Sequence, residues 1–337
     1  MIKISAIASN LNGKRFLPRL IETLGQQQGV ETEVIVVDRE STDGSLEFLA
    51  GFPEVKVVSE PAERGLGAGY ALGARHASHD LLFFSNEDMC FDPECLKRLA
   101  AHIDLESRVG AADPWQWSYD GERWIHGGVR FEKRLWSTNS PHPRRTFEFT
   151  VPLDEGQAIP FPCGGAFLIH RRVYEDIGGW DTSFVLDWEE VDLFVRAWQK
   201  DWTCVTVPSA KVYHAVGAAV AQTGRAGKPI SELRYRSGRS NMAAIAIKYF
   251  SLPAMSVSVG ATLAFTTLVH LIKLQGKRVI LDWSAIQDIA RRLPELMRFR
   301  RENREYNAKK PGEKFFSERR DNTSARIKAD AASVVAR

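Results

Sequence analysis

Glycines, carboxylates and a histidine follow one another closely in the middle of this 337-residue chain. Cys163-Gly164-Gly165-Ala166 is followed by Gly178-Gly179-Trp180-Asp181, then by Glu189 and Glu190 at the start of a helical pattern, and then by His214. Carboxylates and imidazoles can act as general acids, general bases or metal ligands, and glycines allow a ligand to approach the backbone. A purely structural segment seldom combines these residue types, so the segment indicates an enzyme.

Two apolar runs earlier in the chain also lead into acidic turns. Residues 34–37 lead into Asp38, and residues 81–84 lead into Ser85-Asn86-Glu87-Asp88. Short apolar runs are typical of buried strands, and open α/β sheets bind ligands at the carboxyl ends of their strands. We therefore expect Asp38 and Asp88 to lie at the ligand-binding edge of a sheet.

Strand and helix patterns alternate from residue 4 to about residue 109, which predicts parallel βαβ units and an α/β fold. Strand patterns occupy residues 4–8, 33–37, 55–59 and 81–84, and helical spacing occupies residues 16–24, 45–52 and 69–77. Residues 113–162 break the alternation and form a Trp-rich excursion suited to recognition loops. Regular patterns resume with strands at 166–170 and 203–207 and helices at 172–177 and 189–200.

Composition excludes some classes of function. The net charge of +3 is too small to indicate a nucleic-acid partner, and no nucleic-acid-binding motif is present in the sequence. The four cysteines have no Cys-x-x-Cys spacing, which favours reduced thiols in a cytoplasmic protein. The first residues enter a strand pattern directly and do not resemble a secretory signal.

The C-terminal third has a different character. Residues 252–272 contain no Asp, Glu, Lys or Arg, and a run of 21 such residues is close to the length that spans a bilayer. Pro253, Gly260 and His270 keep its hydrophobicity modest, so an interfacial helix, a spanning helix and a packed helix all stay open. Arg and Lys dominate residues 291–320, which would suit anionic lipid headgroups or form a solvated basic tail.

Four segments resemble, in order and spacing, the motifs of inverting family-2 glycosyltransferases, and most of all a bacterial rhamnosyltransferase-like branch. They are VIVVDRESTDGS, LLFFSNEDM, PCGGAFLIHRRVYEDIGGWD, and WEEVDLFVRAW with the later VYH. The resemblance implies a GT-A fold, with a mostly parallel sheet flanked by helices and a helical, basic C-terminal appendage. Residues 1–222 would form the catalytic domain, divided into a nucleotide-binding half (1–112) and an acceptor half (113–222). Residues 223–337 would form a membrane-associating region.

The same resemblance implies a reaction. One sugar would pass with inversion from a nucleotide-sugar, with dTDP-rhamnose or a UDP-sugar favoured, to a hydroxyl of a glycan or polyprenyl-diphosphate-linked acceptor. Mg²⁺ or Mn²⁺ would assist, at the inner face of the cytoplasmic membrane, in cell-surface polysaccharide synthesis. The alternative is an inactive nucleotide-sugar-binding protein, which would need neither Glu190 nor His214. An NAD-dependent oxidoreductase is disfavoured because the first strand-to-helix turn reads Asn10-Leu11-Asn12-Gly13.

The resemblance also assigns nucleotide-binding residues. Asp38 would accept the imide N–H of a uracil or thymine, although a turn-forming role, which fits Asp43 better, is the alternative. Asn10, Asn12, Gly65 and Asn86 complete this group. Gly65 lies in a glycine cluster that either opens a helix near the nucleotide or serves packing.

The metal ligands would be Asp88 and His214. Asn86 stands where the family usually has the first Asp of Asp-x-Asp and would make a weaker sugar or metal contact. Glu87 has no assigned role and is compatible with a solvent-facing position. A carboxylate-held divalent cation would neutralise the leaving diphosphate.

The catalytic base would be Glu190, with Glu189 as the second choice, because an inverting transfer needs one carboxylate to take the proton of the acceptor hydroxyl. Asp187-Trp188-Glu189-Glu190 is also a capping-box pattern, which would make Asp187 the N-cap. Asp192 is expected to orient its neighbours. The remaining residues would line the sugar and acceptor side, with core packing as the alternative for both tryptophans: Gly164, Gly165, Trp180, Asp181 and Trp188.

Overall fold

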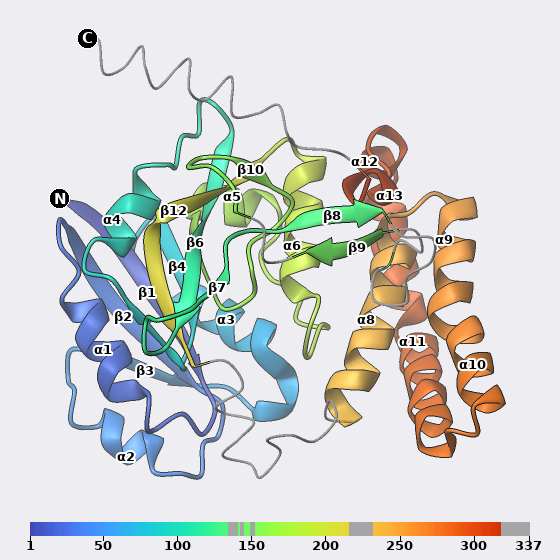
Figure 1. The fold of residues 1–337 in the computed structure, drawn as a ribbon, viewed down its shortest axis with the longest axis horizontal. Coiled ribbons are helices and arrows are strands. Elements are labelled where there is room, and N and C mark those ends of the chain that lie inside the picture. Colours follow the sequence, from blue (N-terminus) through green and yellow to red (C-terminus); the bar gives the residue numbers. More distant parts are fainter. Residues whose placement is uncertain (134–140, 142–144, 149–151, 216–231, 318–337) are drawn as a thin grey trace.

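The computed structural model describes residues 1–133, 141, 145–148, 152–215 and 232–317 (Figure 1). Its centre is a mixed sheet with strand order β10-β12-β6-β11-β4-β1-β2-β3, in which β5 pairs with β12 and β7 with β6. These strands are β1 (Ile2–Asn10), β2 (Val30–Asp38), β3 (Lys56–Ser59), β4 (Leu81–Asn86), β5 (Met89–Phe91), β6 (Val109–Ser118), β7 (Trp124–His126), β10 (Ala158–Ile159), β11 (Ala166–His170) and β12 (Thr203–His214).

The N-terminal half of the sheet consists of the predicted parallel units. β1 pairs in parallel with β2 and β4, and β2 pairs in parallel with β3. In this register Asn10 is level with Asp38 and Ser9 is level with Asn86, so three carboxyl ends meet at one edge. The α/β fold class is confirmed.

Helices cover both faces of the sheet because its central strands present apolar side chains to both sides. Ile7 packs in the cluster on the α3 and α6 side, while its neighbours Ala6 and Ala8 pack in the cluster on the α1 and α4 side. The helices of this part are α1 (Leu17–Gly25), α2 (Ser45–Leu49), the 3₁₀ helix η1 (Ala62–Arg64), α3 (Gly65–His76), α4 (Cys95–Ala100), α5 (Arg171–Asp176) and α6 (Glu189–Gln199).

Residues 113–162 are not a simple excursion. Their first part belongs to β6, a central strand that pairs in parallel with β12 and antiparallel with β11. β7 then folds back on β6, and a separate hairpin of β8 (Arg130–Lys133) and β9 (Arg145–Glu148) reaches toward the C-terminal helices (Figure 1). The Trp-rich composition concealed the strand because Trp115 and Trp117 lie on it.

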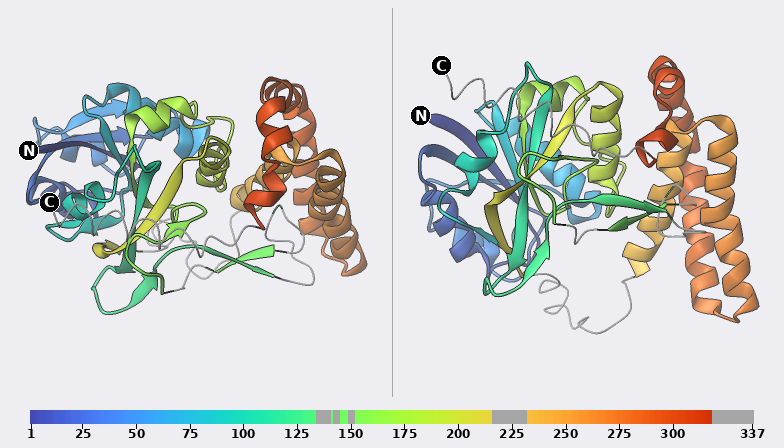
Figure 2. Two further views of the ribbon diagram at one scale, coloured as in Figure 1. Left: turned by 90° about the horizontal axis from the view of Figure 1, so that it is seen from above. Right: turned by 45° about the horizontal axis from the view of Figure 1, so that its top comes forward.

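The C-terminal helices stand to one side of the sheet, beyond α6 (Figures 1 and 2). They are α8 (Glu232–Tyr249), α9 (Leu252–Val259), the π-helical η2 (Gly260–Phe265), α10 (Thr266–Ile272), α11 (Gly276–Glu302), α12 (Arg304–Lys309) and α13 (Gly312–Phe315). Ile245, Tyr249 and Phe315 are buried in the same apolar cluster as Phe167 of the sheet and Phe194 of α6. The predicted helical appendage therefore shares an apolar core with the sheet and α6, and residues 318–320 of the predicted basic run lie outside the described residues.

Candidate active site

Asp88 and His214 face each other beside the end of β4. Asp88 lies in the tight turn between β4 and β5, and His214 is the last residue of β12, which pairs with β5. His214 Nε2 lies 3.2 Å from Asp88 Oδ1. His214 Nδ1 lies 3.0 Å from Gln116 Oε1, a contact that fixes the plane of the imidazole ring. The structure thus brings together the two residues predicted to hold a metal ion.

Gly164 and Gly165 connect this pair to the predicted base. A Cβ atom on Gly164 would lie 3.0 Å from Glu190 Oε1, and one on Gly165 would lie 3.7 Å from His214 Cε1. Gly165 has a φ of +140°, and its carbonyl accepts a 2.8 Å hydrogen bond from Asn86 N. Side chains at either glycine would fill the space between the base and the histidine. The role predicted for these glycines, a close approach of the backbone to a sugar, stays a prediction.

Glu189 and Glu190 differ in exposure although they are neighbours at the start of α6. Glu189 is buried and Glu190 is half-buried. Burial raises the pKa of both carboxyl groups, and the charge of Glu190 raises that of Glu189 further. Glu189 Oε2 has no hydrogen-bond partner within the described chain. A raised pKa suits a general base, and its greater exposure makes Glu190 the carboxylate that a substrate can reach.

Asn10, Asn12 and Asp38 belong to a hydrogen-bonded group at the ends of β1 and β2. Asn10 Nδ2 donates to Asp38 Oδ2 at 2.8 Å, and Ser41 N donates to Asp38 Oδ1 at 2.9 Å. Asn12 Oδ1 accepts from Thr42 N at 2.8 Å. Asp38 is fully buried. Contact between its carboxylate and a nucleobase therefore requires the turn above it to move.

Two turns near this group serve local structure. Asp43 Oδ1 accepts from Ser45 N at 3.0 Å and so holds the start of α2, the role that sequence favoured for Asp43 over Asp38. Gly65 has a φ of +83°, and a Cβ there would lie 2.0 Å from Val185 O. Leu66 N donates to the same carbonyl at 3.2 Å. The packing alternative therefore describes Gly65, and the nucleotide-binding role predicted for it is withdrawn.

Glu87 is buried, not solvent-facing. Burial, together with the charge of Asp88, raises the pKa of Glu87 to about 7. A Cβ on Gly13 would lie 2.4 Å from Glu87 Cγ and 2.5 Å from Asn10 Oδ1. Glu87 therefore joins the Asn10 group to the Asp88 turn and makes the site rich in carboxylates.

Trp180 belongs to the core. Its ring packs against Tyr70, Phe84 and Phe167 at centroid distances of 5.3, 5.3 and 5.8 Å. The residue is only 6% exposed, so no ring face is open to a sugar and the predicted platform is wrong. Trp188 is half-buried at the start of α6 and stays a candidate.

Asp181 binds a buried lysine of α8. Lys248 Nζ lies 2.7 Å from Asp181 Oδ2 and also contacts the Asp192 carboxylate. Asp192 accepts further hydrogen bonds from Arg196 at 2.7 Å and from Tyr249 at 2.6 Å. Burial alone would raise the pKa of Asp181, but the charge of Lys248 lowers it. Asp181 therefore joins its loop to α8, and its place on the acceptor side stays a prediction, while Asp192 contacts and orients its neighbours.

Asp187 does not cap α6. The N-cap position is Trp188, which makes no side-chain capping bond. The Asp187 carboxylate instead accepts hydrogen bonds of 2.8 to 3.1 Å from Nε and Nη2 of Arg234 on α8. The capping-box pattern failed because it is local, and the arginine lies far along the chain.

Several residues of the site escaped prediction. Tyr70 O–H donates to Asn86 Oδ1 at 2.9 Å, and Gln116 orients His214. Asp113 Oδ1 accepts from Cys163 N at 3.2 Å, and burial raises the pKa of Asp113. Gln116 and Asp113 are buried on β6, so recognising that strand would have drawn attention to its polar residues. No local pattern pointed to Tyr70.

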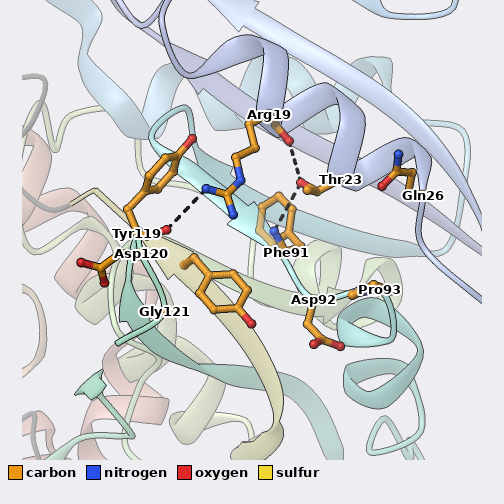
Figure 3. Close-up of a pocket in the computed structure, with 10 residues that line it drawn as sticks. Arg19, Thr23, Gln26, Phe91, Asp92, Pro93, Tyr119, Asp120 and Gly121 are labelled. Carbon is orange, nitrogen blue, oxygen red and sulfur yellow. Dashed lines mark hydrogen bonds between the residues drawn. The ribbon is translucent and has the colours of Figure 1, made fainter. Parts of the chain in front are cut away.

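A separate cavity lies beside α1 (Figure 3). It has a volume of about 400 Å³ and is lined by Arg19, Phe91, Asp92, Tyr119 and Tyr213 among others. Successive side chains of a strand point to opposite faces, so the Tyr213 side and the His214 side of β12 are different. The residues predicted for the site are absent from the walls of this cavity, which is thus distinct from the candidate active site.

Comparison with known proteins agrees with this geometry. The model of the family described as Glycosyl transferase family 2 matches residues 5–178, more than half of the chain. This chain belongs to glycosyltransferase family 2. Its predicted class of activity, a glycosyltransferase, and its family are therefore confirmed.

Two curated glycosyltransferases illustrate the relationship. An uncharacterized glycosyltransferase, YwdF of Bacillus subtilis, is 24% identical over 220 residues, which cover 65% of this chain and 76% of YwdF. The N-acetylglucosaminyl-diphospho-decaprenol L-rhamnosyltransferase of Mycobacterium tuberculosis is 24% identical over 222 residues, covering 59% of this chain and 71% of that enzyme.

Solved structures support the fold. GalNAc-T7, crystallised with UDP, GalNAc and Mn²⁺, is similar with a TM-score of 0.52 and 18% identity; the match covers 64% of this chain but 44% of GalNAc-T7. S. aureus TarS 1-349 in complex with UDP is similar with a TM-score of 0.50 and 14% identity, over 94% of this chain and 89% of TarS 1-349. At these identities the similarity shows the GT-A-like fold alone.

Proposed function

We propose that this glycosyltransferase moves one sugar, with inversion and with help from a divalent cation, from a nucleotide-sugar to a hydroxyl of a lipid-linked glycan. The observation that carries the proposal is the convergence of Glu190, Gly164-Gly165 and the Asp88–His214 pair in one place. The rhamnosyltransferase relative favours dTDP-rhamnose as the donor and a polyprenyl-diphosphate-linked acceptor. UDP is the alternative nucleotide, because the two structural neighbours were crystallised with it.

Glu190 has the features of the general base. Its carboxylate lies at the Gly164 backbone, is open to one side and has a raised pKa because of burial. It would take the proton of the acceptor hydroxyl as that oxygen attacks C1 of the sugar from the face opposite the diphosphate. The C1–O bond to the diphosphate would break in the same step, with a transition state similar to that of glycoside hydrolysis.

Asp88 and His214 fit a divalent cation whose coordination is completed by substrate. When His214 Nδ1–H donates to Gln116 Oε1, Nε2 is left as a lone-pair acceptor that faces Asp88 Oδ1, so these two residues would hold the cation. The described residues contain no group of three or more His, Cys, Asp or Glu side chains that could hold a metal. Phosphate oxygens and water would supply the other ligands, as is usual for Mg²⁺ in nucleotide enzymes. Such a cation, when bound, offsets the charge of the leaving diphosphate.

The donor can be identified by turnover. With Mn²⁺ and a polyprenyl-diphosphate-linked acceptor, we expect one of dTDP-rhamnose and a set of UDP- and GDP-sugars to release its nucleoside diphosphate much faster than the others. Binding of every donor without release from any would favour the inactive nucleotide-sugar-binding alternative.

The helix of Leu252–Ile272 supports attachment to a membrane surface, because its polar side faces the protein interior and its apolar side is exposed. Among the described helices, it is the one long and apolar enough to cross a bilayer, with a mean hydropathy of 1.6. Its buried polar side chains recur every four residues, at Ser258, Thr262, Thr266 and His270. Its exposed side chains are mainly apolar and include Val257, Phe265, Leu268, Leu271 and Ile272. A helix on a water-exposed surface has the reverse arrangement.

The neighbouring part of α11 continues this apolar face. Trp283 and Ile280 are 59% and 67% exposed, whereas Asp282 between them is buried and lies 2.6 Å from His270 Nδ1. Lys273 in the connection between α10 and α11, and Lys277 and Arg278 in the first turn of α11, are exposed and make this end of the helices basic. An apolar face next to cations is the combination that attaches proteins to anionic bilayers. We therefore propose that the enzyme attaches to the inner face of the cytoplasmic membrane.

Charge placed on this face should weaken attachment. We expect the wild-type chain to sediment with vesicles that contain phosphatidylglycerol, and Leu271→Glu with Ile272→Glu to reduce the partition coefficient at least about tenfold, since burying one such side chain contributes roughly 1.5–3 kcal/mol. Leu46→Glu, on the exposed surface of α2, is the matched control and should bind normally. Wild-type protein that stays in the supernatant at low salt would contradict the proposal. Substitutions are preferable to truncation, because removing α8 would leave Asp192 without Lys248.

A further inference from the structure

The turn that leads into α6 has an unusual backbone. Asp187 and Trp188 have φ angles of +62° and +75°, both in the left-handed region. Asp is tolerated there, but a bulky residue such as Trp is an outlier, and two in succession persist only where the surrounding structure imposes them. Glu189 and Glu190 follow directly, so this turn determines the direction in which both carboxylates enter the site.

Helix α8 supplies the contacts that impose this conformation. The buried Asn241 donates from Nδ2 to the carbonyl of Leu186 at 3.1 Å and to that of Asp187 at 2.8 Å. About two turns away on the same helix, Arg234 binds the Asp187 carboxylate through two nitrogens. A forked contact of this kind fixes orientation as well as distance.

The loop is also held from two other sides. Arg292 of α11 donates to Asn241 Oδ1 at 2.8 Å and to Ser183 Oγ at 3.1 Å. On the opposite side, α3 donates from Leu66 N to Val185 O. The loop before α6 is thus fastened between the nucleotide half of the protein and the C-terminal helices.

We propose that Asn241 and Arg234 are positioning residues that hold the Asp187–Trp188 turn in its left-handed form and so place the Glu190 carboxylate for the reaction. The proposal rests on the proposed role of Glu190 as the base. Neither residue needs to touch a substrate. If the turn relaxes, the start of α6 shifts, and a displacement of about 1 Å at a reacting group can cost roughly 10²-fold in rate. The donor, held at Asp88 and the ends of β1 and β2, would still bind.

The experiment is a comparison of kcat and KM. Asn241→Asp keeps the size of the side chain and the acceptor for Arg292 but removes the two donated hydrogen bonds. We expect kcat to fall about 10- to 100-fold while KM for the nucleotide-sugar stays within about twofold. Ser240→Ala is the matched control: Ser240 is equally buried, and its hydroxyl bonds to Ser237 O within α8. Its kcat should stay near the wild-type value.

Arg234→Gln keeps the test decisive if Asn241→Asp does not fold, because half of the Arg234 side chain is exposed. It should lower kcat several-fold, again without a rise in KM for the donor. Wild-type kcat in the folded variants, or a rise in KM with unchanged kcat, would overturn the proposal. Glu190→Gln separates this result from the assignment of the base. Normal activity of Glu190→Gln refutes Glu190 as the base, whereas an inactive Glu190→Gln beside a normal Asn241→Asp refutes only the positioning role.

Discussion

Glu190→Gln should reduce sugar transfer by roughly 10²-fold or more while leaving donor binding intact, because the amide cannot accept the proton of the acceptor hydroxyl. Glu189→Gln should have a much smaller effect, since Glu189 is buried beside α3, where Gly67 approaches its Cβ. Initial rates of transfer and the dissociation constant of the nucleotide-sugar measure the two effects separately. Glu295→Gln, on the exposed surface of α11, is a suitable control. If Glu189→Gln loses sugar transfer while Glu190→Gln transfers at the wild-type rate, the base is Glu189.

The dependence of kcat on pH tests the same assignment, because the direction of its shift in two variants can be predicted. The base acts when ionised, so the rate should rise with pH through the raised pKa of Glu190. After burial, the charge of Asp187 also raises this pKa, and Arg234 lowers it. Asp187→Asn should therefore move the acidic limb of kcat to lower pH, and Arg234→Gln should move it to higher pH. If the acidic limb of the kcat profile shifts in the same direction in both variants, a group other than Glu190 controls it.

Asp88→Ala and His214→Ala should each abolish most of the metal-dependent binding of nucleoside diphosphate. For the wild type, a diphosphate at 100 times its dissociation constant should raise the free energy of unfolding by about 2.7 kcal/mol. We expect this gain in thermal melts with UDP or dTDP and Mn²⁺, little of it in excess EDTA, and little of it in either variant. Each variant removes one of the two facing side chains proposed to hold the cation, which would leave it with a single protein ligand.

His76→Ala, on the exposed end of α3, is the control for this experiment and should behave as the wild type. Full transfer activity in excess EDTA would contradict the metal assignment. Loss of folding in both variants without ligand would indicate that the Asp88–His214 contact serves stability instead.

Local patterns predicted the parallel half of the sheet because each strand there is a short apolar run with a polar residue at its end. The same alternation placed Asp38 and the turn that contains Asp88 at one edge, and the register puts the ends of β1, β2 and β4 there. The contact between Asp88 and His214 was not derivable from such patterns, because β12 and β5 are distant in the chain. It was expected from the family resemblance alone.

Two of the side-chain predictions depend on contacts with helix α8. Whether Asp181 lines an acceptor site or binds Lys248, and whether Asp187 caps α6 or binds Arg234, is decided by α8, which follows both residues by dozens of positions. The same holds for the helix at 252–272, where composition revealed the apolar character but only its neighbours determine that the polar side faces inward. Where elements distant in the chain meet, tertiary contacts decide which way a side chain points. The order of motifs along the sequence therefore cannot predict it.

The measurement that tests the central claim most directly is the anomeric configuration of the transferred sugar. NMR of the product formed from the donor that turns over should show inversion at C1 relative to the nucleotide-sugar, because the proposed base, Glu190, would assist a single attack from the face opposite the diphosphate. Retention of configuration would require two displacements or a different geometry of attack, and would contradict the role of Glu190 and the mechanism built on it.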